Sequence, residues 1–254
     1  ALCVIPARYA STRLPGKPLL DRTGKPLIQH VVERLTEATT VSRVIVATDD
    51  AAIAEAVGGF GGEARMTRGD HPNGTSRIAE VITALREAGE AVPDVIVNVQ
   101  GDEPEIEAGL IDRLVLDLAD QSPPAEGGAP MATLASPFAP DEDPADPNIV
   151  KLVVDQQSMA MYFSRALIPF DRDGTGHRPL KHPGLYAYRP DFLLEYVKLP
   201  PTPLEQAEQL EQLRALEHGH RILAVQVVTS HHGIDTPQQY EAFVQRMRKR
   251  ADPR

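Results

Sequence analysis

Short apolar runs alternate with segments of helical periodicity along the first half of the chain, and this alternation restricts the possible folds more than any other feature. The strand-like runs lie at 2–5, 43–47, 94–99 and 131–135. The helix-like segments, with apolar residues every three or four positions, lie at 26–38, 50–57, 75–88 and 110–118. Val/Ile-rich runs separated by helices are typical of parallel sheets with helices on both faces. The sequence therefore predicts an α/β protein with a mostly parallel central sheet.

The pattern changes between about residues 137 and 200, where short apolar runs such as 149–154 and 185–188 alternate with prolines and charged turns. Such spacing is typical of antiparallel strands. We expect residues 1–136 and 201–254 to form the α/β core and residues 137–200 to form a smaller inserted antiparallel region. After it, Thr202, Pro203 and Glu205 predict a helix that starts with a capping box and continues to about residue 217. A strand at 222–228 and a helix at 237–247 follow.

Composition excludes several classes of function. The formal net charge of −10 over 254 residues disfavours binding to nucleic acid or to anionic membranes, although it permits a local cationic pocket. The single cysteine, Cys3, excludes an intrachain disulfide and a cysteine-based zinc site, which fits a reducing cytoplasm. No apolar run reaches the length of a membrane span.

The loop after the first apolar run carries three cations. Arg8, Arg13 and Lys17 lie between small or turn-forming residues, and Gly16 permits close approach of the backbone to a ligand. Arginine and lysine neutralise phosphate oxygens through charge-assisted hydrogen bonds. The loop therefore indicates a triphosphate site, and the alternative is an ordinary basic surface loop.

Polar clusters follow three of the predicted strands, at 8–17, 48–50 and 100–102. Ligands of parallel α/β sheets bind at the carboxyl ends of the strands, so these clusters are expected to converge. Asp102 follows a strongly apolar strand and a glycine, and its carboxylate could hold Mg²⁺ opposite the cationic loop. From its spacing alone it could equally be a turn aspartate that caps the next helix.

The second half of the chain offers fewer clear candidates. Asp235 precedes a proline that starts a helix, so it could bind a metal or simply cap that helix. Glu211 lies beside the apolar stripe of the predicted 202–217 helix and faces either a pocket or water. Arg165 interrupts an apolar segment and could bind a substrate carboxylate or form an internal salt bridge. His231 and His232 lack a partner at a zinc-ligand spacing.

Familiar nucleotide and hydrolase motifs are absent from the sequence. It contains no Gly-x-x-x-x-Gly-Lys-Ser/Thr loop, and the glycines at 58–62 lack dinucleotide-binding spacing. No Gly-x-Ser-x-Gly elbow is present.

A series of motifs extends along nearly the whole chain, beginning with the opening loop IPARYASTRLPGKPL. The further segments, in order, include VATD at 46–49, MTR at 66–68 with Asp70-His71, Gly74-Thr75 with Arg77, VNVQGDEP at 97–104, Phe163-Ser-Arg165, His182 with Tyr186, LEQLR at 210–214 and Asp235-Thr-Pro237. Together these motifs resemble the sugar-activating cytidylyltransferases, and most closely the branch that activates the acidic sugar 3-deoxy-D-manno-octulosonate (Kdo). The opening loop is similar to the nucleotide-binding signature of this family.

The resemblance implies a reaction in which CTP and Kdo give CMP-Kdo and pyrophosphate, a product used in lipopolysaccharide biosynthesis. It also implies the fold of nucleotide-diphospho-sugar transferases, a Mg²⁺ cofactor, a cytoplasmic location and a homodimer, with residues 137–200 serving sugar binding and dimerisation. Arg8, Lys17, Asp102 and Asp235 would be catalytic, and the last two would bind the metal. The implied CTP-binding residues are Arg8, Ser11, Arg13, Lys17, Thr67, Arg68, Gly74, Thr75 and Arg77. The implied sugar-binding residues are Gln100, Arg165, His182, Tyr186, Glu211 and Gln212.

The chain departs from the family pattern at four positions: Ser76 replaces an expected Glu, Pro183 an aliphatic residue, Lys181 an Arg and Phe170 a Trp. None of them is a proposed metal or phosphate ligand. Ser76 and Pro183 leave two alternatives open for the substrate, which are Kdo or a related acidic sugar such as 8-amino-Kdo or a sialic acid. A third alternative is a nucleotide-binding module without catalysis, although the presence of both Asp102 and Asp235 disfavours it.

Overall fold

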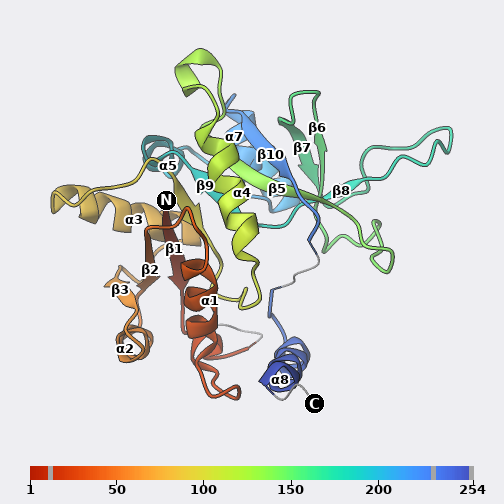
Figure 1. Ribbon diagram of the computed structural model, residues 1–254. Coiled ribbons are helices and arrows are strands. Elements are labelled where there is room, and N and C mark those ends of the chain that lie inside the picture. The colour runs from red at the N-terminus through yellow and green to blue at the C-terminus, as the bar shows by residue number, and fades with distance from the viewer. Residues whose placement is uncertain (11–13, 230–232, 252–254) are drawn as a thin grey trace. The chain divides into compact units, whose positions relative to one another are not determined.

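The computed structural model describes residues 1–10, 14–229 and 233–251. The chain divides into two compact units. Unit 1 comprises Ala1–Pro93, Val97–Asp112 and the chain from residue 231 onward, and unit 2 comprises Asp94–Ile96 and Arg113 to residue 230. Each unit is built around its own strands (Figure 1).

Unit 1 is built on parallel strands. Its strands are β1 (Leu2–Ala7), β2 (Arg43–Thr48), β3 (Glu63–Met66) and most of β4 (Ile96–Asn98). β1 pairs in parallel with β2, which pairs in parallel with β3, and β4 neighbours β1. Ala7 lies opposite Thr48, so the loops after β1 and β2 leave the same edge of the sheet. β1 is buried along nearly its whole length, as expected for a strand covered on both faces.

Helices cover these strands, as the apolar periodicity predicts. They are η1 (Lys17–Leu19), α1 (Leu27–Thr36), α2 (Ala51–Gly59), α3 (Gly74–Glu87) and α8 (Pro237–Ala251). α1 buries Leu27, Ile28, Val31, Val32 and Leu35, the apolar stripe seen in the sequence. Asp50 caps α2 by accepting hydrogen bonds from the backbone N–H groups of Ala52 and Ile53.

Helix α8 packs against the region around η1 and α1. Tyr240, Phe243 and Val244 are buried in one cluster with Leu14 and Leu27. Burying a side chain such as Phe243 contributes about 1.5–3 kcal/mol. This packing fixes residues 233–236, which lead into α8, near the loop that follows β1.

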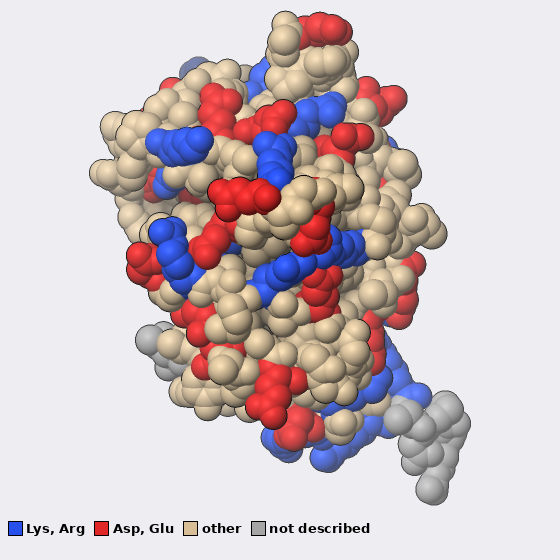
Figure 2. Space-filling view, turned by 90° about the vertical axis from the view of Figure 1, so that its left-hand side faces the viewer, with Lys and Arg blue, Asp and Glu red and all other residues tan. Residues whose placement is uncertain are grey.

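Acidic and basic side chains are interspersed on the face shown in Figure 2. The ion pairs in unit 1 include those of Arg43 and Arg65 with Glu63 and Glu90. Ion pairs that stay accessible to solvent contribute little to stability, typically about 0–1 kcal/mol each, and these four side chains are only partly buried.

Unit 2 combines one parallel pair of strands with antiparallel ones. The parallel pair is β5 (Met131–Pro137) with β10 (Ile222–Gln226). β9 (Tyr186–Tyr188) and β8 (Leu180–Lys181) pair antiparallel with β5. β6 (Lys151–Val154) pairs antiparallel with both β8 and β7 (Ala160–Ser164). The other elements of this part of the chain are η2 (Pro124–Glu126), α5 (Pro190–Tyr196), α6 (Pro203–Glu208) and α7 (Leu213–Glu217), while α4 (Ala108–Ala119) has residues in both units.

The predicted α/β class, with parallel strands, flanking helices and an antiparallel region, is confirmed. The assignment of residues 1–136 and 201–254 to a nucleotide-binding core, and of 137–200 to sugar binding and dimerisation, stays a prediction. No helix in the described part of the chain has the length and apolar character that crossing a membrane requires.

The prediction of one continuous helix over 202–217 is wrong. α6 ends at Glu208, and Gln209 adopts a left-handed conformation with φ 54°. α7 begins only at Leu213. The start is as predicted, because the Glu205 carboxylate accepts a hydrogen bond from the backbone N–H of Thr202. Glu211 therefore lies in the turn between two helices and not beside a helical stripe.

Candidate functional site

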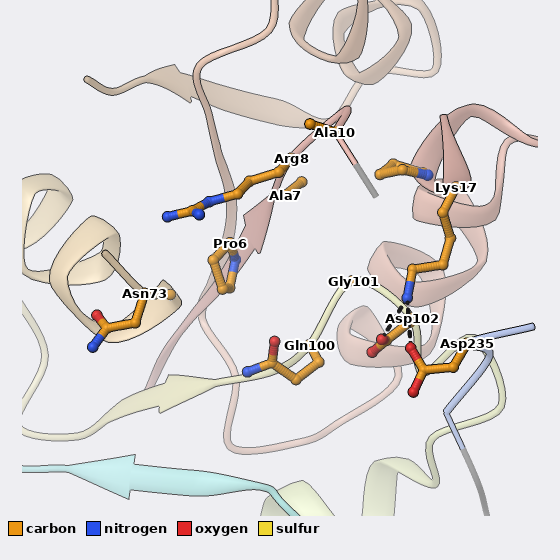
Figure 3. Close-up of a pocket in the computed structure, with 12 residues that line it drawn as sticks. Pro6, Ala7, Arg8, Ala10, Lys17, Asn73, Gln100, Gly101, Asp102 and Asp235 are labelled. Atoms are coloured by element: carbon orange, nitrogen blue, oxygen red, sulfur yellow. Dashed lines mark hydrogen bonds and ion pairs between the residues drawn. The ribbon is translucent and has the colours of Figure 1, made fainter. Parts of the chain in front are cut away.

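A cleft of about 420 Å³ opens in unit 1 beside the loop that follows β1 (Figure 3). This volume lies in the range of small-molecule sites. The residues that line the cleft come from the ends of β1 and β4, from η1, from the start of α3 and from the segment before α8. They are Pro6, Ala7, Arg8, Ala10, Lys17, Pro18, Asn73, Gly74, Gln100, Gly101, Asp102 and Asp235. Six of the predicted site residues, Arg8, Lys17, Gly74, Gln100, Asp102 and Asp235, are thus brought together.

Lys17 joins the two carboxylates predicted to bind metal. Its Nζ lies 2.7 Å from Oδ2 of Asp102 and 3.2 Å from Oδ1 of Asp235, and it donates to the carbonyl oxygen of Ile234 at 3.0 Å. The lysine side chain is 14% exposed. The backbone N–H of Ile234 also donates to the carbonyl of Asp102 at 2.8 Å, so the two aspartate segments are tied together.

The positions of Asp102 and Asp235 fit a divalent cation. Both carboxylates are close enough to share one cationic group, the ammonium of Lys17. Oxygen ligands of this type suit Mg²⁺, which usually takes one or two carboxylates and completes its shell with water and phosphate oxygens. Among the described residues, no group of three or more His, Cys, Asp or Glu is placed to hold a metal ion.

Arg8 lies on the other side of the cleft and is directed toward Asn73, away from the carboxylates (Figure 3). Its Nη2 donates to the backbone carbonyl of His71. Asn73 caps α3 by accepting a hydrogen bond from the backbone N–H of Ser76 at 2.9 Å. The start of α3 therefore forms the wall of the cleft next to Arg8, and the free N–H groups of a helix start favour anions.

Gly74 permits the close packing of this wall. A Cβ atom at position 74 would lie 2.9 Å from Cγ of Pro6, closer than such contacts occur in proteins. The glycine thus lets α3 start directly against the end of β1.

Arg77 lies beneath the surface, although the resemblance assigns it to the CTP pocket. It is 0% exposed, and its Nη1 donates to Oγ1 of Thr67 at 2.7 Å and forms an ion pair with Asp49 at 3.0 Å. Its Nε and Nη2 have no hydrogen-bond partner in the described residues. Arg77 therefore joins the ends of β2 and β3 to α3. Arg68 is instead exposed, and Thr75 is buried.

His182, Tyr186 and Gln212, all from the predicted sugar set, lie together in unit 2. The His182 ring meets Phe163 and Tyr186 edge to face, with centroid distances of 4.9 Å and 5.4 Å. Its Nε2 lies 2.9 Å from the hydroxyl oxygen of Thr133, which donates its own hydrogen to the carbonyl of Leu185. The hydroxyl can therefore only accept from His182, so the ring carries its hydrogen on Nε2.

The other ring nitrogen of His182, Nδ1, is the acceptor facing Nε2 of Gln212 at 3.5 Å. Desolvation lowers the pKa of His182 to about 3. Burial also raises the pKa of Tyr186 above its ordinary value. His182 is thus a neutral ring that orients Gln212.

Arg165 binds backbone carbonyls and not a carboxylate side chain through its guanidinium. Nε donates to the carbonyl of Glu208 at 2.8 Å and Nη1 to that of Pro147 at 3.1 Å. The carboxylate of Glu208 in turn accepts from the hydroxyl of Ser164 and from the backbone N–H of Arg165. The guanidinium of Arg165 therefore donates to backbone carbonyl groups instead of forming the internal salt bridge considered from the sequence.

Ser11, Arg13, His231 and His232 lie outside the described residues. Sequence reasoning missed Asn73 and Glu208. Asn73 could have been found as an N-cap, because an Asn directly before Gly74-Thr75 and an apolar periodic segment is a helix-start signal. Glu208 gave no such signal, since its contacts with Ser164 and Arg165 are distant in sequence.

Comparison with known proteins shows the family of this chain. The family model described as "Cytidylyltransferase" matches residues 2–222. The chain belongs to the cytidylyltransferase family, and the sequence-based prediction of this family is confirmed.

The similar proteins within this family carry a more specific name. The chain is 51% identical to the 3-deoxy-manno-octulosonate cytidylyltransferase of Syntrophobacter fumaroxidans, over 95% of this chain and 94% of the relative. It is 48% identical to the enzyme of the same name from Geobacter sulfurreducens, over 96% and 98%. A solved structure of a CMP:2-keto-3-deoxy-manno-octonic acid synthetase complexed with CTP matches with a TM-score of 0.89 and 44% identity, covering 98% of each chain.

Proposed function

We propose that this protein transfers CMP from CTP to Kdo, giving CMP-Kdo and pyrophosphate. The observation that carries this proposal is the cleft of unit 1, in which two cationic side chains and two carboxylates surround a space large enough for a small ligand. The names of relatives at 48–51% identity over almost the full chain support the nucleotide and the sugar. The solved relative that is complexed with CTP supports the same nucleotide.

In the proposed reaction the anomeric hydroxyl oxygen of the sugar forms a bond to the α-phosphorus of CTP. The bond from that phosphorus to the bridging oxygen of the β-phosphate breaks, and pyrophosphate leaves with that oxygen. The proton of the sugar hydroxyl passes to water. Such transfers depend mainly on positioning and on neutralising phosphate charge. Arg8 would hold the triphosphate from one side of the cleft, next to the start of α3. Lys17 would hold it from the other side.

Asp102 and Asp235 would hold Mg²⁺, and when bound the metal would neutralise phosphate charge and lower the pKa of the sugar hydroxyl. Lys17 contacts both carboxylates in this structure, so metal binding would require its ammonium to move. The freed ammonium has phosphate oxygens as its natural partner. The same residue is therefore placed to exchange the carboxylates for the triphosphate.

The sugar-binding set proposed from the sequence includes Arg165, His182, Tyr186, Glu211 and Gln212, which belong to unit 2. Gln100, the remaining member of that set, lines the cleft of unit 1. The neutral His182 would act by holding the amide of Gln212 toward sugar hydroxyls. Arg165 would act through the turn at 208–209 that it stabilises, and its charge favours a sugar carboxylate nearby. Thr67, Arg68, Thr75 and Arg77 would shape the cytidine pocket, with Arg77 acting from beneath. Ser11 and Arg13 keep their proposed phosphate roles. We also propose that the protein is a homodimer and that it is located in the cytoplasm.

A pyrophosphate-release assay with CTP and Mg²⁺ tests the proposal when Kdo, 8-amino-Kdo and a sialic acid are compared, with ATP, GTP and UTP as control nucleotides. We expect release with CTP and Kdo, and CMP-Kdo as the product by mass spectrometry. Faster pyrophosphate release with another acidic sugar would identify that sugar, and not Kdo, as the substrate. CTP binding without release for any sugar would instead identify a non-catalytic module.

A further inference from the structure

The backbone carbonyl that accepts the hydrogen bond from Arg8 belongs to His71, whose buried side chain pairs with a partly exposed carboxylate. The side chain of His71 is 3% exposed, and its Nε2 contacts the carboxylate of Glu80 from the second turn of α3. Neither His71 nor Glu80 is among the described residues that line the cleft. The pair therefore lies one layer behind Arg8.

The hydrogen bonds around His71 define its protonation. Nδ1 lies 3.1 Å from the hydroxyl oxygen of Ser76, and that hydroxyl donates to the carbonyl of Asn73 at 3.0 Å. Because a hydroxyl has one hydrogen, Ser76 can only accept from His71. Nε2 faces a carboxylate, which also accepts. Both ring nitrogens therefore face acceptors, so the ring is placed to donate from Nδ1 to Ser76 and from Nε2 to Glu80.

Glu80 has a second set of contacts on the same loop. Its carboxylate accepts from the backbone N–H of Arg68 at 3.2 Å and 3.3 Å, and the Arg68 guanidinium lies 3.4 Å away. Burial raises the pKa of Glu80, but the hydrogen bonds from His71 and Arg68 outweigh this effect and lower it. Asp70, 3.7 Å from Arg68, is the other charged group beside the pair. Glu80 therefore ties both ends of the segment 68–71 to α3.

We propose that His71 and Glu80 are positioning residues that hold the Arg8 guanidinium for the triphosphate. The pair fixes the 68–73 segment on α3, and the carbonyl of His71 fixes Arg8 at the cleft. The site takes a nucleoside triphosphate, so the proposal rests on the proposed function. It assigns to Glu80 an effect on CTP that acts only through Arg8.

A double-mutant cycle on CTP binding tests this assignment. The variants are Glu80→Gln, Arg8→Ala and the double variant, and the control is Glu87→Gln, an exposed carboxylate at the end of the same helix. The Kd of CTP with Mg²⁺ is measured by calorimetry or by NMR titration, well below the melting temperature of each variant. We expect Glu80→Gln to raise the Kd roughly tenfold in the wild-type background. In the Arg8→Ala background we expect less than about a twofold change.

An equal loss in both backgrounds, or no loss in the wild-type background, would overturn the proposal. The first result indicates a structural role of the loop that is independent of Arg8. Ser76→Ala, which removes the acceptor of Nδ1, replaces Glu80→Gln in the cycle if the latter does not fold.

The ¹⁵N shifts of the His71 ring test the pair without any ligand. We expect both ring nitrogens to carry hydrogen in the wild-type protein, and one of them to lose it in Glu80→Gln. A ring nitrogen without hydrogen in the wild-type protein contradicts the donor roles of His71. This readout does not depend on turnover, so its failure is distinguishable from failure of the proposed function, which would appear as absence of pyrophosphate release from the wild-type protein.

Discussion

Lys17 is the residue on which two parts of the proposed site depend. The sequence predicts that Lys17 binds phosphate, whereas in the structure its ammonium contacts the carboxylates of Asp102 and Asp235. Both positions follow from the positive charge of the ammonium group. It would pair with the carboxylates when no metal is bound, and with phosphate oxygens when a metal binds the carboxylates. Under the proposed function, Lys17 and Mg²⁺ would therefore compete for the same two carboxylates.

Lys17→Met should separate these roles. Without Mg²⁺ the variant lacks the ammonium that the two carboxylates share, so we expect the free energy of unfolding to fall by about 1–2 kcal/mol. We also expect Mg²⁺ to bind more tightly, because its competitor is gone, while pyrophosphate release falls. Denaturant unfolding and titration calorimetry measure the two effects. The matched control is Lys25→Met, which breaks an exposed ion pair with Glu33. Weaker Mg²⁺ binding by Lys17→Met would contradict competition.

The low pKa of His182 predicts that the free energy of unfolding depends on pH. Its pKa in the folded protein is about 3, lowered by desolvation from an ordinary value of 6.5. Between these values the unfolded chain binds a proton at this ring and the folded protein does not, so stability falls as pH falls from about 6.5 toward 3. We expect His182→Gln to make the slope of unfolding free energy against pH shallower in this window. His177→Gln, at an exposed position, should leave the slope unchanged. Equal slopes for all three proteins would refute this origin.

At the scale of elements, the start of α3 is the part of the fold that positions the cleft. It meets β1 at Gly74 and Pro6, carries the cap Asn73 and lies next to Arg8. A helix start and a strand end are thereby fixed against each other at one wall of the site.

Gly74→Ala tests this contact. Its new Cβ would lie 2.9 Å from Cγ of Pro6, so α3 must shift, and we expect a loss of about 1–3 kcal/mol in stability with weaker CTP binding. Gly109→Ala is the matched change in helix α4, where nothing lies within 4 Å of the new atom. There we expect a gain of about 0.4–1 kcal/mol and unchanged CTP binding. Thermal unfolding gives both values, and a loss at both positions would show that the close packing at Gly74 is not the cause.

Elements with strong periodicity or unbroken apolar runs could be predicted from the sequence. α1 and α3 bury the stripes seen at 26–38 and 75–88, and β1 and β2 follow their Val/Ile runs. β3 was not predicted because Glu63–Met66 contains two charged residues and gains its pairing from β2. The break at Gln209 was also missed, since a glutamine in a left-handed conformation leaves no local signal. Tertiary contacts decide such positions.

Within the site, the charged residues at strand ends could be predicted, but their partners could not. Lys17, Asp102 and Asp235 meet across long sequence separations, and the sequence left capping as an alternative for both aspartates. Arg165 was assigned a carboxylate partner, whereas its guanidinium binds carbonyls of Pro147 and Glu208. Every residue has a backbone carbonyl, so the sequence does not indicate which of them accepts a hydrogen bond from Arg165. Such partners are found only in the structure.

At the scale of the whole molecule, the proposed homodimer calls for an apolar surface in the 137–200 region. Phe170 and Met161 in that region are 86% and 64% exposed. We expect sedimentation of the wild-type protein at twice the mass of one chain, and a shift toward monomer for Phe170→Asp combined with Met161→Asp. Val228→Asp, at an apolar position that is 85% exposed but outside the region, is the control. A dimer that survives the double change, or is lost in the control, would place the interface elsewhere.

The central claim is that one cleft holds CTP between cationic side chains and a metal on Asp102 and Asp235. The most direct test is Mg²⁺-dependent pyrophosphate release from CTP and Kdo by Asp102→Asn beside the wild-type protein, with circular dichroism and thermal unfolding to verify the fold. We predict that the wild-type protein releases pyrophosphate and that the folded variant loses this activity at every Mg²⁺ concentration tested. Near-normal turnover by the variant would contradict the metal site and with it this account of the cleft.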